Sequence, residues 1–288
     1  MKHLRKSFPF FIAPALIAYI LVVIVPFIMG IVYSFTDWKG AYVADWWVGL
    51  ENYKIALTGA EFLYSLRLTL LFTICNVILV NILAFSLALL VTRGFKGSNF
   101  FRTTFFLPNV IGGLILGYIW KFVFDVVFDK MLYNATFMEG FRYWLQDEKK
   151  AFWALVIVAT WQMAGYMMII YIAAIQNIPE ELLEAADVDG AKFFTKLKHI
   201  IMPLVTQAFT VTIFLTLSNS FKLLDANLSL TRGEPGRTTE LLALHIFKTG
   251  QEYGRYGLAQ AQSIIFFLMI AAVTLVQVYY SKKKEIES

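Results

Sequence analysis

Long apolar runs, almost free of charged side chains, fill most of this sequence of 288 residues. A helix needs about 20 consecutive apolar residues to cross the hydrocarbon core of a bilayer. Backbone amides and carbonyls need partners within lipid, so a continuous apolar run there forms a helix, whereas a transmembrane barrel would show short alternating segments. The sequence therefore predicts an all-α membrane protein with six transmembrane helices. They are expected at residues 8–33, 66–91, 104–127, 151–175, 204–224 and 258–280.

The composition supports this fold class. Hydrophobic residues make up 59% of the chain and charged residues only 16%, and the mean hydropathy is +0.65. Soluble domains typically carry about 25% charged residues. Lys2, Arg5 and Lys6 precede an apolar run, as in a signal peptide, but the run at 8–33 is too long for one and no A-x-A cleavage site follows it. We therefore expect the first membrane helix to be retained.

Basic residues at the ends of the apolar runs indicate how the chain is oriented. An even number of spans puts both termini on one side of the membrane. The loop at 92–102 holds Arg93, Lys96 and Arg102 without any acidic residue, and positive charge collects on the cytoplasmic side. Both termini are therefore predicted to be cytoplasmic. The same charges suit the anionic headgroups of the lipid bilayer, so the net charge of +5 does not indicate a nucleic-acid partner.

No pattern typical of an enzyme is present. The chain lacks a Walker A pattern and the motifs H-E-x-x-H and G-x-S-x-G. Its single cysteine, Cys75, excludes an internal disulfide and a thiolate metal cluster. We therefore expect no catalytic residue, no bound metal and no cofactor in this chain.

Charge inside the apolar runs is sparse, which bears on the class of transporter. A charge at the bilayer centre costs at least about 3 kcal/mol on insertion scales, so ion-coupled carriers keep such residues only for function. An ion-coupled secondary carrier is therefore the less favoured alternative. The charged residues of the runs lie near helix ends, at Arg67, Lys121, Asp125, Lys222 and Asp225.

Residues 176–203 form a polar interruption between the fourth and fifth runs. Pro179 to Val188 is predicted to be one helix, and Gly190 ends it because glycine adopts a positive φ at little cost. A second helix is expected at 191–201. The segment is either a cytoplasmic coupling loop that a soluble partner moves, or an amphipathic linker on the membrane surface. Periodicity alone leaves both interpretations open.

The spacing of residues in this segment resembles the signature of importer-type ABC permeases, which is E-A-A-x-x-x-G, nine residues, then I-x-L-P. Met202 departs from it, since the signature has leucine there. The chain is similar to the carbohydrate branch of the family over most of its length, at residues 11–17, 33–38, 49–53 and 160–168, and more loosely at 230–235. The signature is matched at Glu184, Ala185, Ala186, Gly190, Ile200 and Pro203.

The resemblance implies a type I ABC importer permease, with one transmembrane domain over residues 1–288 and its cytoplasmic coupling loop at 176–203. Such a permease imports a sugar, here an oligosaccharide, by alternating access across a bacterial inner (plasma) membrane. The implied partners are a second permease in a heterodimer, two cytoplasmic ATPases that bind ATP and magnesium, and an extracellular solute-binding protein. The ATPase-coupling residues would be Glu184, Ala185, Ala186, Asp189, Gly190 and Ala191.

Neutral polar and aromatic residues interrupt the fourth and fifth runs. A sugar is recognised by amide and hydroxyl hydrogen bonds and by aromatic faces, although polar residues also bond one membrane helix to another. By resemblance to the larger pore subunit of maltose importers, Tyr166, Asn219, Ser220 and Leu223 fall at positions that line a sugar site. Together with Gln162 they form the expected substrate-binding set.

Two basic residues are compatible with a different class of solute. A phosphate ester would favour a basic pore, and Lys222 and Arg67 lie near the ends of two apolar runs. The alternative function is therefore an ABC permease for a polyol or a glycerol phosphate.

Overall fold

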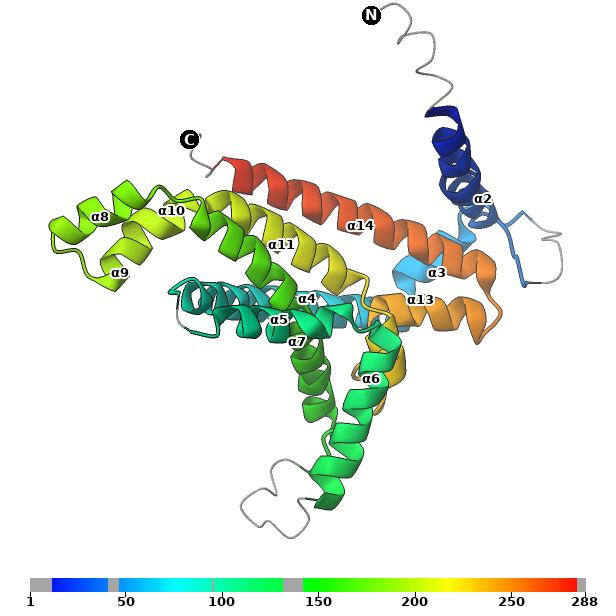
Figure 1. The fold of residues 1–288 in the computed structure, drawn as a ribbon. Coiled ribbons are helices and arrows are strands. Elements are labelled where there is room, and N and C mark those ends of the chain that lie inside the picture. Colours follow the sequence, from blue (N-terminus) through cyan, green and yellow to red (C-terminus); the bar gives the residue numbers. More distant parts are fainter. Residues whose placement is uncertain (1–11, 41–46, 95, 132–141, 284–288) are drawn as a thin grey trace, which may run out of the picture. The chain divides into compact units, whose positions relative to one another are not determined.

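The computed structural model describes residues 12–40, 47–94, 96–131 and 142–283. Within these ranges the chain is helical, apart from turns, loops and one isolated antiparallel bridge between Thr36 and Trp47. The predicted all-α fold class is therefore confirmed (Figure 1). Four described helices are long and apolar enough to cross a bilayer, and two bent helix pairs bring the possible number of spans to six. The four are Ile12–Tyr33, Ala60–Val91, Glu148–Gln176 and Tyr256–Lys282.

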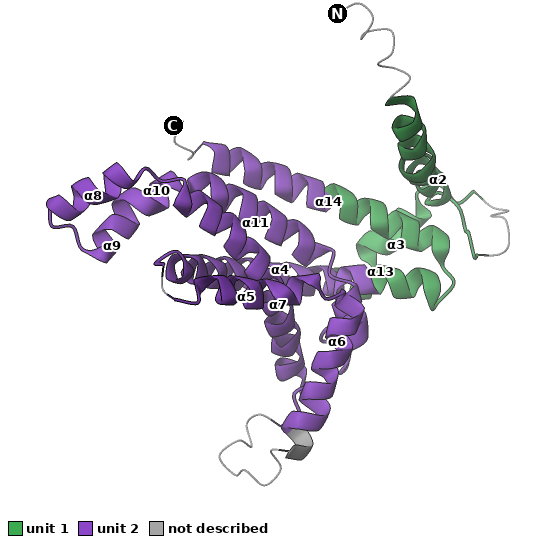
Figure 2. Ribbon diagram, in the orientation of Figure 1, with its two compact units in different colours: residues 1–63, 245–268 green, residues 64–244, 269–288 purple. Residues whose placement is uncertain are grey.

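The chain falls into two compact units (Figure 2). Residues 1–63 and 245–268 form unit 1, and residues 64–244 and 269–288 form unit 2. The basic residues Lys2, Arg5 and Lys6, with the first residues of the 8–33 run, lie outside the described residues. The single permease domain expected over the whole chain stays a prediction.

Unit 1 joins the first span to the segment that follows it. Its short helices are η1 (Ile20–Ile24), α2 (Val25–Tyr33) and α3 (Glu51–Thr58). The side-chain amide of Asn52 in α3 is buried and donates to the carbonyls of Ser34 and Thr36, each at 2.9 Å. These bonds satisfy two carbonyls beyond the end of α2 and hold α3 against them.

Unit 2 contains the helices that frame the candidate site. Among them α7 is the most buried of the long spans. It begins after Asp147, whose carboxylate accepts hydrogen bonds from the backbone amides of Lys149 and Lys150 at 3.0 and 2.9 Å, as an N-cap residue does. The elements that lie wholly in unit 2 and matter here are α5 (Ser98–Val110), α6 (Gly113–Phe122), η2 (Val123–Met131), α7 (Glu148–Gln176), α11 (Thr206–Phe221) and α12 (Asp225–Leu230). Those with residues in both units are α4 (Ala60–Val91), α13 (Leu242–Gln251) and α14 (Tyr256–Lys282).

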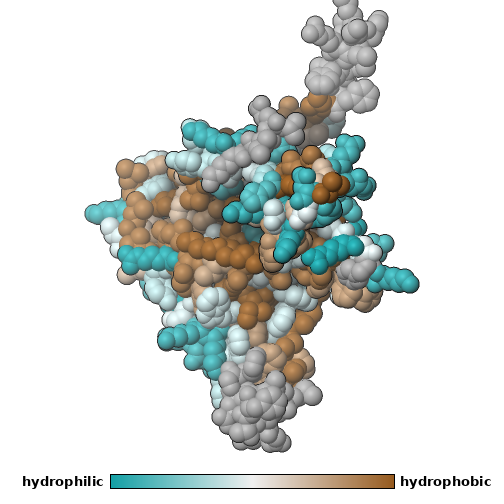
Figure 3. Space-filling view, turned by 90° about the vertical axis from the view of Figure 1, so that its left-hand side faces the viewer, coloured by the Kyte–Doolittle hydropathy of each residue, from teal (hydrophilic) through white to brown (hydrophobic). Residues whose placement is uncertain are grey.

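Apolar side chains both fill the interior and cover much of the surface. One buried cluster joins Phe72 of α4 to Leu155 of α7, and another joins Val80 of α4 to Met168 of α7. Hydrophobic side chains also spread over broad areas of the face drawn in Figure 3. Soluble monomers rarely expose such areas, so this surface agrees with a chain that is surrounded by lipid or by other membrane subunits.

The third apolar run, expected at 104–127, is divided into two helices shortly after Pro108, where proline predicts a bend or a helix end. Ser98–Val110 and Gly113–Phe128 meet at a bend of 102°. Pro108 lies in the last turn of α5, where its missing amide and its ring disfavour continuation of the helix. Glycines at the start of α6 then allow a close approach to α12. A Cβ added at Gly113 would lie 2.8 Å from the Cβ of Asp225.

A ladder of hydroxyl groups lines the buried side of α11. Thr212, Thr216 and Ser220 follow at intervals of four residues and share one face of the helix. Their hydroxyls donate to the carbonyls of Ala208, Thr212 and Thr216 at 2.8, 2.7 and 2.6 Å. The hydroxyl of Tyr171 in α7 lies 2.7 Å from both the Thr212 hydroxyl and the Asn81 side-chain oxygen in α4. One buried tyrosine therefore bonds three helices together.

Replacing Tyr171 with phenylalanine is expected to destabilise this three-helix contact by about 1–2 kcal/mol, because the side-chain oxygen of Asn81 loses its donor in a buried site. The apparent melting temperature of the purified protein is the measurement. Tyr280→Phe is the matched control, since Tyr280 is exposed in α14 and its hydroxyl makes no hydrogen bond to a described residue. Equal melting temperatures for the two variants would contradict the assigned role of Tyr171.

Candidate functional site

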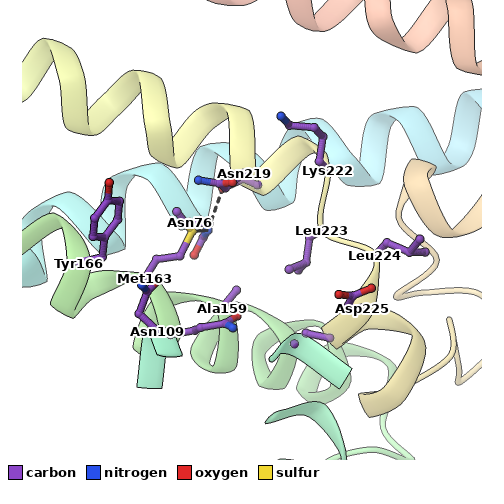
Figure 4. Close-up of a pocket in the computed structure, with 14 residues that line it drawn as sticks. Asn76, Asn109, Ala159, Met163, Tyr166, Asn219, Lys222, Leu223, Leu224 and Asp225 are labelled. Atoms are coloured by element: carbon purple, nitrogen blue, oxygen red, sulfur yellow. Dashed lines mark hydrogen bonds between the residues drawn. The ribbon is translucent and has the colours of Figure 1, made fainter. Parts of the chain in front are cut away.

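A cavity of about 530 Å³ lies in unit 2, where α7 and α11 face the bend between α5 and α6 (Figure 4). All five residues expected to bind substrate line this one cavity, although they come from two helices and the turn after the second. Residues that the sequence did not single out complete the wall. The lining residues are Asn76, Asn109, Gly113, Ala159, Gln162, Met163, Tyr166, Asn219, Ser220, Lys222, Leu223, Leu224, Asp225 and Ala226.

Asn76 of α4 organises one side of the cavity. It is fully buried. Its amide nitrogen donates to the hydroxyl of Ser220 at 2.8 Å, drawn as a dashed line in Figure 4, and its side-chain oxygen accepts a bond from Thr160 at 3.0 Å. The Ser220 hydroxyl in turn donates to the Thr216 carbonyl. The hydroxyl of Ser220 is therefore occupied within the protein, and Asn76 holds it against the wall.

Tyr166 and Asn219 present polar groups to the cavity that the protein itself does not use. Both side chains are exposed, and neither makes a hydrogen bond to another described residue. Gln162 is partly committed, because its amide nitrogen donates to the Ile111 carbonyl at 3.2 Å. Leu223 adds an apolar surface. The cavity thus offers a phenol and amides, the donors and acceptors that a polyhydroxylated solute needs.

The cavity holds one side chain of each charge. Lys222 and Asp225 both line it and both are exposed. In Figure 4 the ammonium group of Lys222 extends away from Asp225, and no ion pair joins the two. Arg67, the other basic residue considered for a phosphate ester, is not among the lining residues. Within the described ranges no group of three or more histidine, cysteine, aspartate or glutamate side chains could hold a metal ion.

The polar segment between α7 and α11 folds as two antiparallel pieces (Figure 1). The first is α8 (Glu180–Val188), and the second joins α9 (Phe193–Lys196) to the π-helical turn η4 (Leu197–Ile201) and α10 (Met202–Leu204). Gly190 has a φ of +74°, so the break expected at this glycine is confirmed. The second piece starts two residues later than the expected 191–201.

Contacts within this segment hold the two pieces together. An ion pair joins them, since the ammonium group of Lys196 in α9 lies 2.7 Å from the carboxylate of Asp187 in α8. A further contact links the second piece to the loop at 92–102, where the guanidinium of Arg93 lies 4.6 Å from the ring centre of Phe193. Ala186 is buried, whereas Leu182 is 45% exposed.

Four of the six predicted coupling residues are exposed, whereas Ala186 is buried and Ala191 is half-buried. Glu184, Ala185, Asp189 and Gly190 are exposed. Large apolar side chains stand beside them in the same segment, with Val188 at 88% and Phe194 at 78% exposure. Exposed apolar groups that stand together are typical of a surface that another protein or a membrane covers, so this exposure agrees with both interpretations of the segment.

Sequence reasoning missed Asn76 and Asn109 as lining residues. Asn76 is one of two asparagines in the apolar run at 66–91. A polar amide in a membrane helix needs a partner or a function, so this signal was present in the sequence. Asn109 follows Pro108, and only the bend of α5 brings it to the cavity.

The fold and the site define a class before any comparison: a polytopic helical permease with a polar cavity and an exposed two-helix loop. Residues 80–286 match the family of binding-protein-dependent transport system inner membrane components, and the chain belongs to this family. It is a multi-pass membrane permease of an ABC transport system and not an enzyme.

Relatives and solved structures extend the comparison over almost the whole chain. It is 47% identical over 277 residues to a probable starch degradation products transport system permease protein (AmyD) of Thermoanaerobacterium thermosulfurigenes, covering 96% of this chain and 94% of that one. It is 30% identical over 263 residues to the multiple sugar-binding transport system permease protein (MsmF) of Streptococcus mutans, covering 91% and 90%. A crystal structure of a bacterial ABC transporter that imports alginate contains a chain of the same fold, with a TM-score of 0.83 at 20% identity and 98% coverage of both chains.

Proposed function

We propose that this permease carries neutral oligosaccharides derived from starch into the cell. The 47% identity to a permease named for starch degradation products supports this solute class. The single observation that carries the proposal is the cavity itself, where Tyr166 and Asn219 offer uncommitted hydrogen-bonding groups beside Leu223. The cavity is less suited to a phosphate ester, because Arg67 is not among the lining residues and the negative charge of Asp225 offsets the positive charge of Lys222.

The proposed assembly pairs this chain with a second permease, two cytoplasmic ATPases and an extracellular solute-binding protein. ATP and magnesium would bind to the ATPases. The termini and the segment at 176–203 would face the cytoplasm of a bacterial cell, which the acid-free loop at 92–102 supports. The exposed residues of α8, with Glu184 among them, would dock into the ATPase.

The connection between the loop and the cavity gives a mechanism for alternating access. The coupling segment joins the end of α7 to the start of α11. The same two helices carry Gln162 and Tyr166 on one side of the cavity and Asn219 on another. A displacement of the segment by an ATPase therefore acts on both walls of the solute site. ATP binding then shifts the populations of two states that differ in their affinity for the solute.

The proposal is tested by purifying the chain with its co-expressed partners and measuring ATP hydrolysis in proteoliposomes. Maltotriose delivered by the solute-binding protein should stimulate hydrolysis and accumulate inside. Glycerol and glycerol 3-phosphate serve as the alternative solutes. Stimulation by either of these, with none by maltotriose, would replace the proposed solute class.

Alanine at Tyr166 or Asn219 is expected to lower maltotriose uptake by about tenfold, since each lost hydrogen bond to a solute is worth roughly 0.5–1.5 kcal/mol and the phenol ring adds contact area. Assembly with the partners should be intact, because neither side chain bonds to a described residue. Tyr280→Ala and Asn99→Ala are the matched controls, exposed and outside the cavity. Unchanged uptake in both cavity variants would remove the two residues from the site.

A further inference from the structure

The carboxylate of Asp225 occupies an unusual position in the cavity. It begins α12 and lies at the wall formed by Leu223, Leu224 and Ala226. Figure 4 shows the carboxylate on the side of α12 that faces Leu223. An exposed carboxylate that lines a polar cavity is available to a solute, provided that nothing in the protein neutralises it.

No described basic side chain neutralises Asp225. Asp225 forms no ion pair with a basic side chain of the described residues. Lys222 also lines the cavity, but its ammonium group extends away from Asp225 (Figure 4). Asp225 therefore contributes an uncompensated negative charge to its part of the wall.

The neighbouring helix is built to leave room for this carboxylate. A Cβ added at Gly113 of α6 would lie 2.8 Å from the Cβ of Asp225 and 3.7 Å from its Oδ2. Contact at 2.8 Å is too close for two carbon atoms, so a side chain at position 113 would displace Asp225. Glycine at this point of the bend keeps the carboxylate at the cavity.

The other lining residues indicate which solutes a negative charge at Asp225 favours. Asn109, Gln162, Tyr166 and Asn219 supply neutral groups that both donate and accept hydrogen bonds. An ionised carboxylate only accepts, and a hydrogen bond from a hydroxyl to a charged acceptor is roughly twice as strong as a neutral one. Sugar hydroxyls can supply that donor. A phosphate or a uronate brings a negative charge instead and is repelled.

We propose that Asp225 contacts the solute and makes the cavity selective for neutral polyhydroxylated solutes over anionic ones of the same size. This inference rests on the proposed function in that the cavity is taken as the solute site. It goes beyond that function by assigning the selection to one residue of the permease, acting after the solute-binding protein has delivered its cargo.

The test measures equilibrium binding to the purified full complex without the solute-binding protein, so that only the permease selects. The probes are maltotriose and maltotriose oxidised at C6 of its terminal residue to a uronate. The unaltered complex should bind the uronate about tenfold more weakly, because a tenfold change corresponds to the repulsion of two like charges about 12 Å apart at an effective dielectric constant near 20. In Asp225→Asn maltotriose binding should weaken several-fold, and the two affinities should come within about twofold of each other.

Two further measurements keep the test decisive. Raising the salt concentration should reduce the preference of the unaltered complex for maltotriose over the uronate, because salt screens the repulsion between Asp225 and the uronate. This measurement uses the unaltered protein and so does not depend on the folding of a variant. Lys222→Gln is the matched charge control and should leave maltotriose preferred. Maltotriose binding with an unchanged preference in Asp225→Asn would overturn the inference alone. An unaltered complex that binds neither probe would overturn the proposed sugar function and the inference with it.

Discussion

Proline at position 190 is expected to abolish solute-stimulated ATP hydrolysis and to lower uptake by more than about tenfold, since a loss of 1.4 kcal/mol already corresponds to a factor of ten. Gly190 has a φ of +74°, whereas the proline ring fixes φ near −65°. The backbone amide of Gly190 also donates to the carbonyl of Asp187 at 3.0 Å, and proline has no amide hydrogen. The turn between α8 and α9 therefore cannot form as it stands.

The space around Gly190 allows a matched control. No atom lies within 4 Å of a Cβ added at this position, so a substitution acts through the backbone alone. Asparagine tolerates the left-handed region better than other non-glycine residues. Gly190→Asn should therefore retain most of the uptake that Gly190→Pro loses. Equal activity of the proline variant and the unaltered protein would show that the turn is not needed for coupling.

The variant Glu184→Lys tests whether the segment at 176–203 contacts the ATPase without disturbing the fold of the segment. Glu184 is exposed in α8 and forms no ion pair with a described residue. Reversal of its charge should leave the loop folded but weaken its contact with the ATPase. The measurements are the amount of ATPase that co-purifies and the number of solute molecules imported per ATP. Normal values of both, together with normal values in Gly190→Pro, would contradict the assignment of 176–203 as the coupling loop.

The segment at 176–203 shows how much of the fold can be predicted from the sequence. Glycine with a neighbouring aspartate ends a helix for local reasons, so the break at Gly190 follows from residue chemistry alone. The apolar runs likewise predict where the long helices lie. The ends of the helices are predicted less well. For example, α4 begins at Ala60 rather than near residue 66. The residues added at its start include Glu61, Tyr64 and Ser65, whose polar side chains lower the hydropathy although the helix continues through them.

The angle of the bend in the third run and the composition of the cavity required the structure. Pro108 marks a place where a helix can end, but its 102° angle depends on how closely α6 approaches α12 at Gly113. Cavity walls depend on such angles, so Asn109 could not be assigned from spacing. Four of the five expected site residues came from the resemblance, which already implied that they line one site. Gln162, expected from its polar side chain alone, lies one turn before Tyr166 and lines the same cavity. Binding of a sugar by the five residues stays a prediction.

Alanine at Gly165 is expected to have the second largest effect, through the packing of α5 against α7. A Cβ at this glycine would collide with the backbone carbonyl of Phe105 and would come within 2.9 Å of the Cα of Phe106. Both contacts are with backbone, so no rotamer change relieves them and the two helices must separate. Overpacking of this kind costs about 1–3 kcal/mol, and more where backbone must move.

The Gly165→Ala substitution is also expected to disturb the cavity, because the part of α7 that packs against α5 lines it. Gln162, one turn before Gly165, donates to the carbonyl of Ile111 at the α5–α6 bend, and Tyr166 follows Gly165 directly. Gly165→Ala should therefore lower the melting temperature of the complex and reduce uptake by at least about tenfold. Gly112→Ala is the control, since a Cβ there meets nothing within 4 Å. If the two alanine variants matched in stability and uptake, the close crossing of α5 and α7 would not be what shapes the solute site.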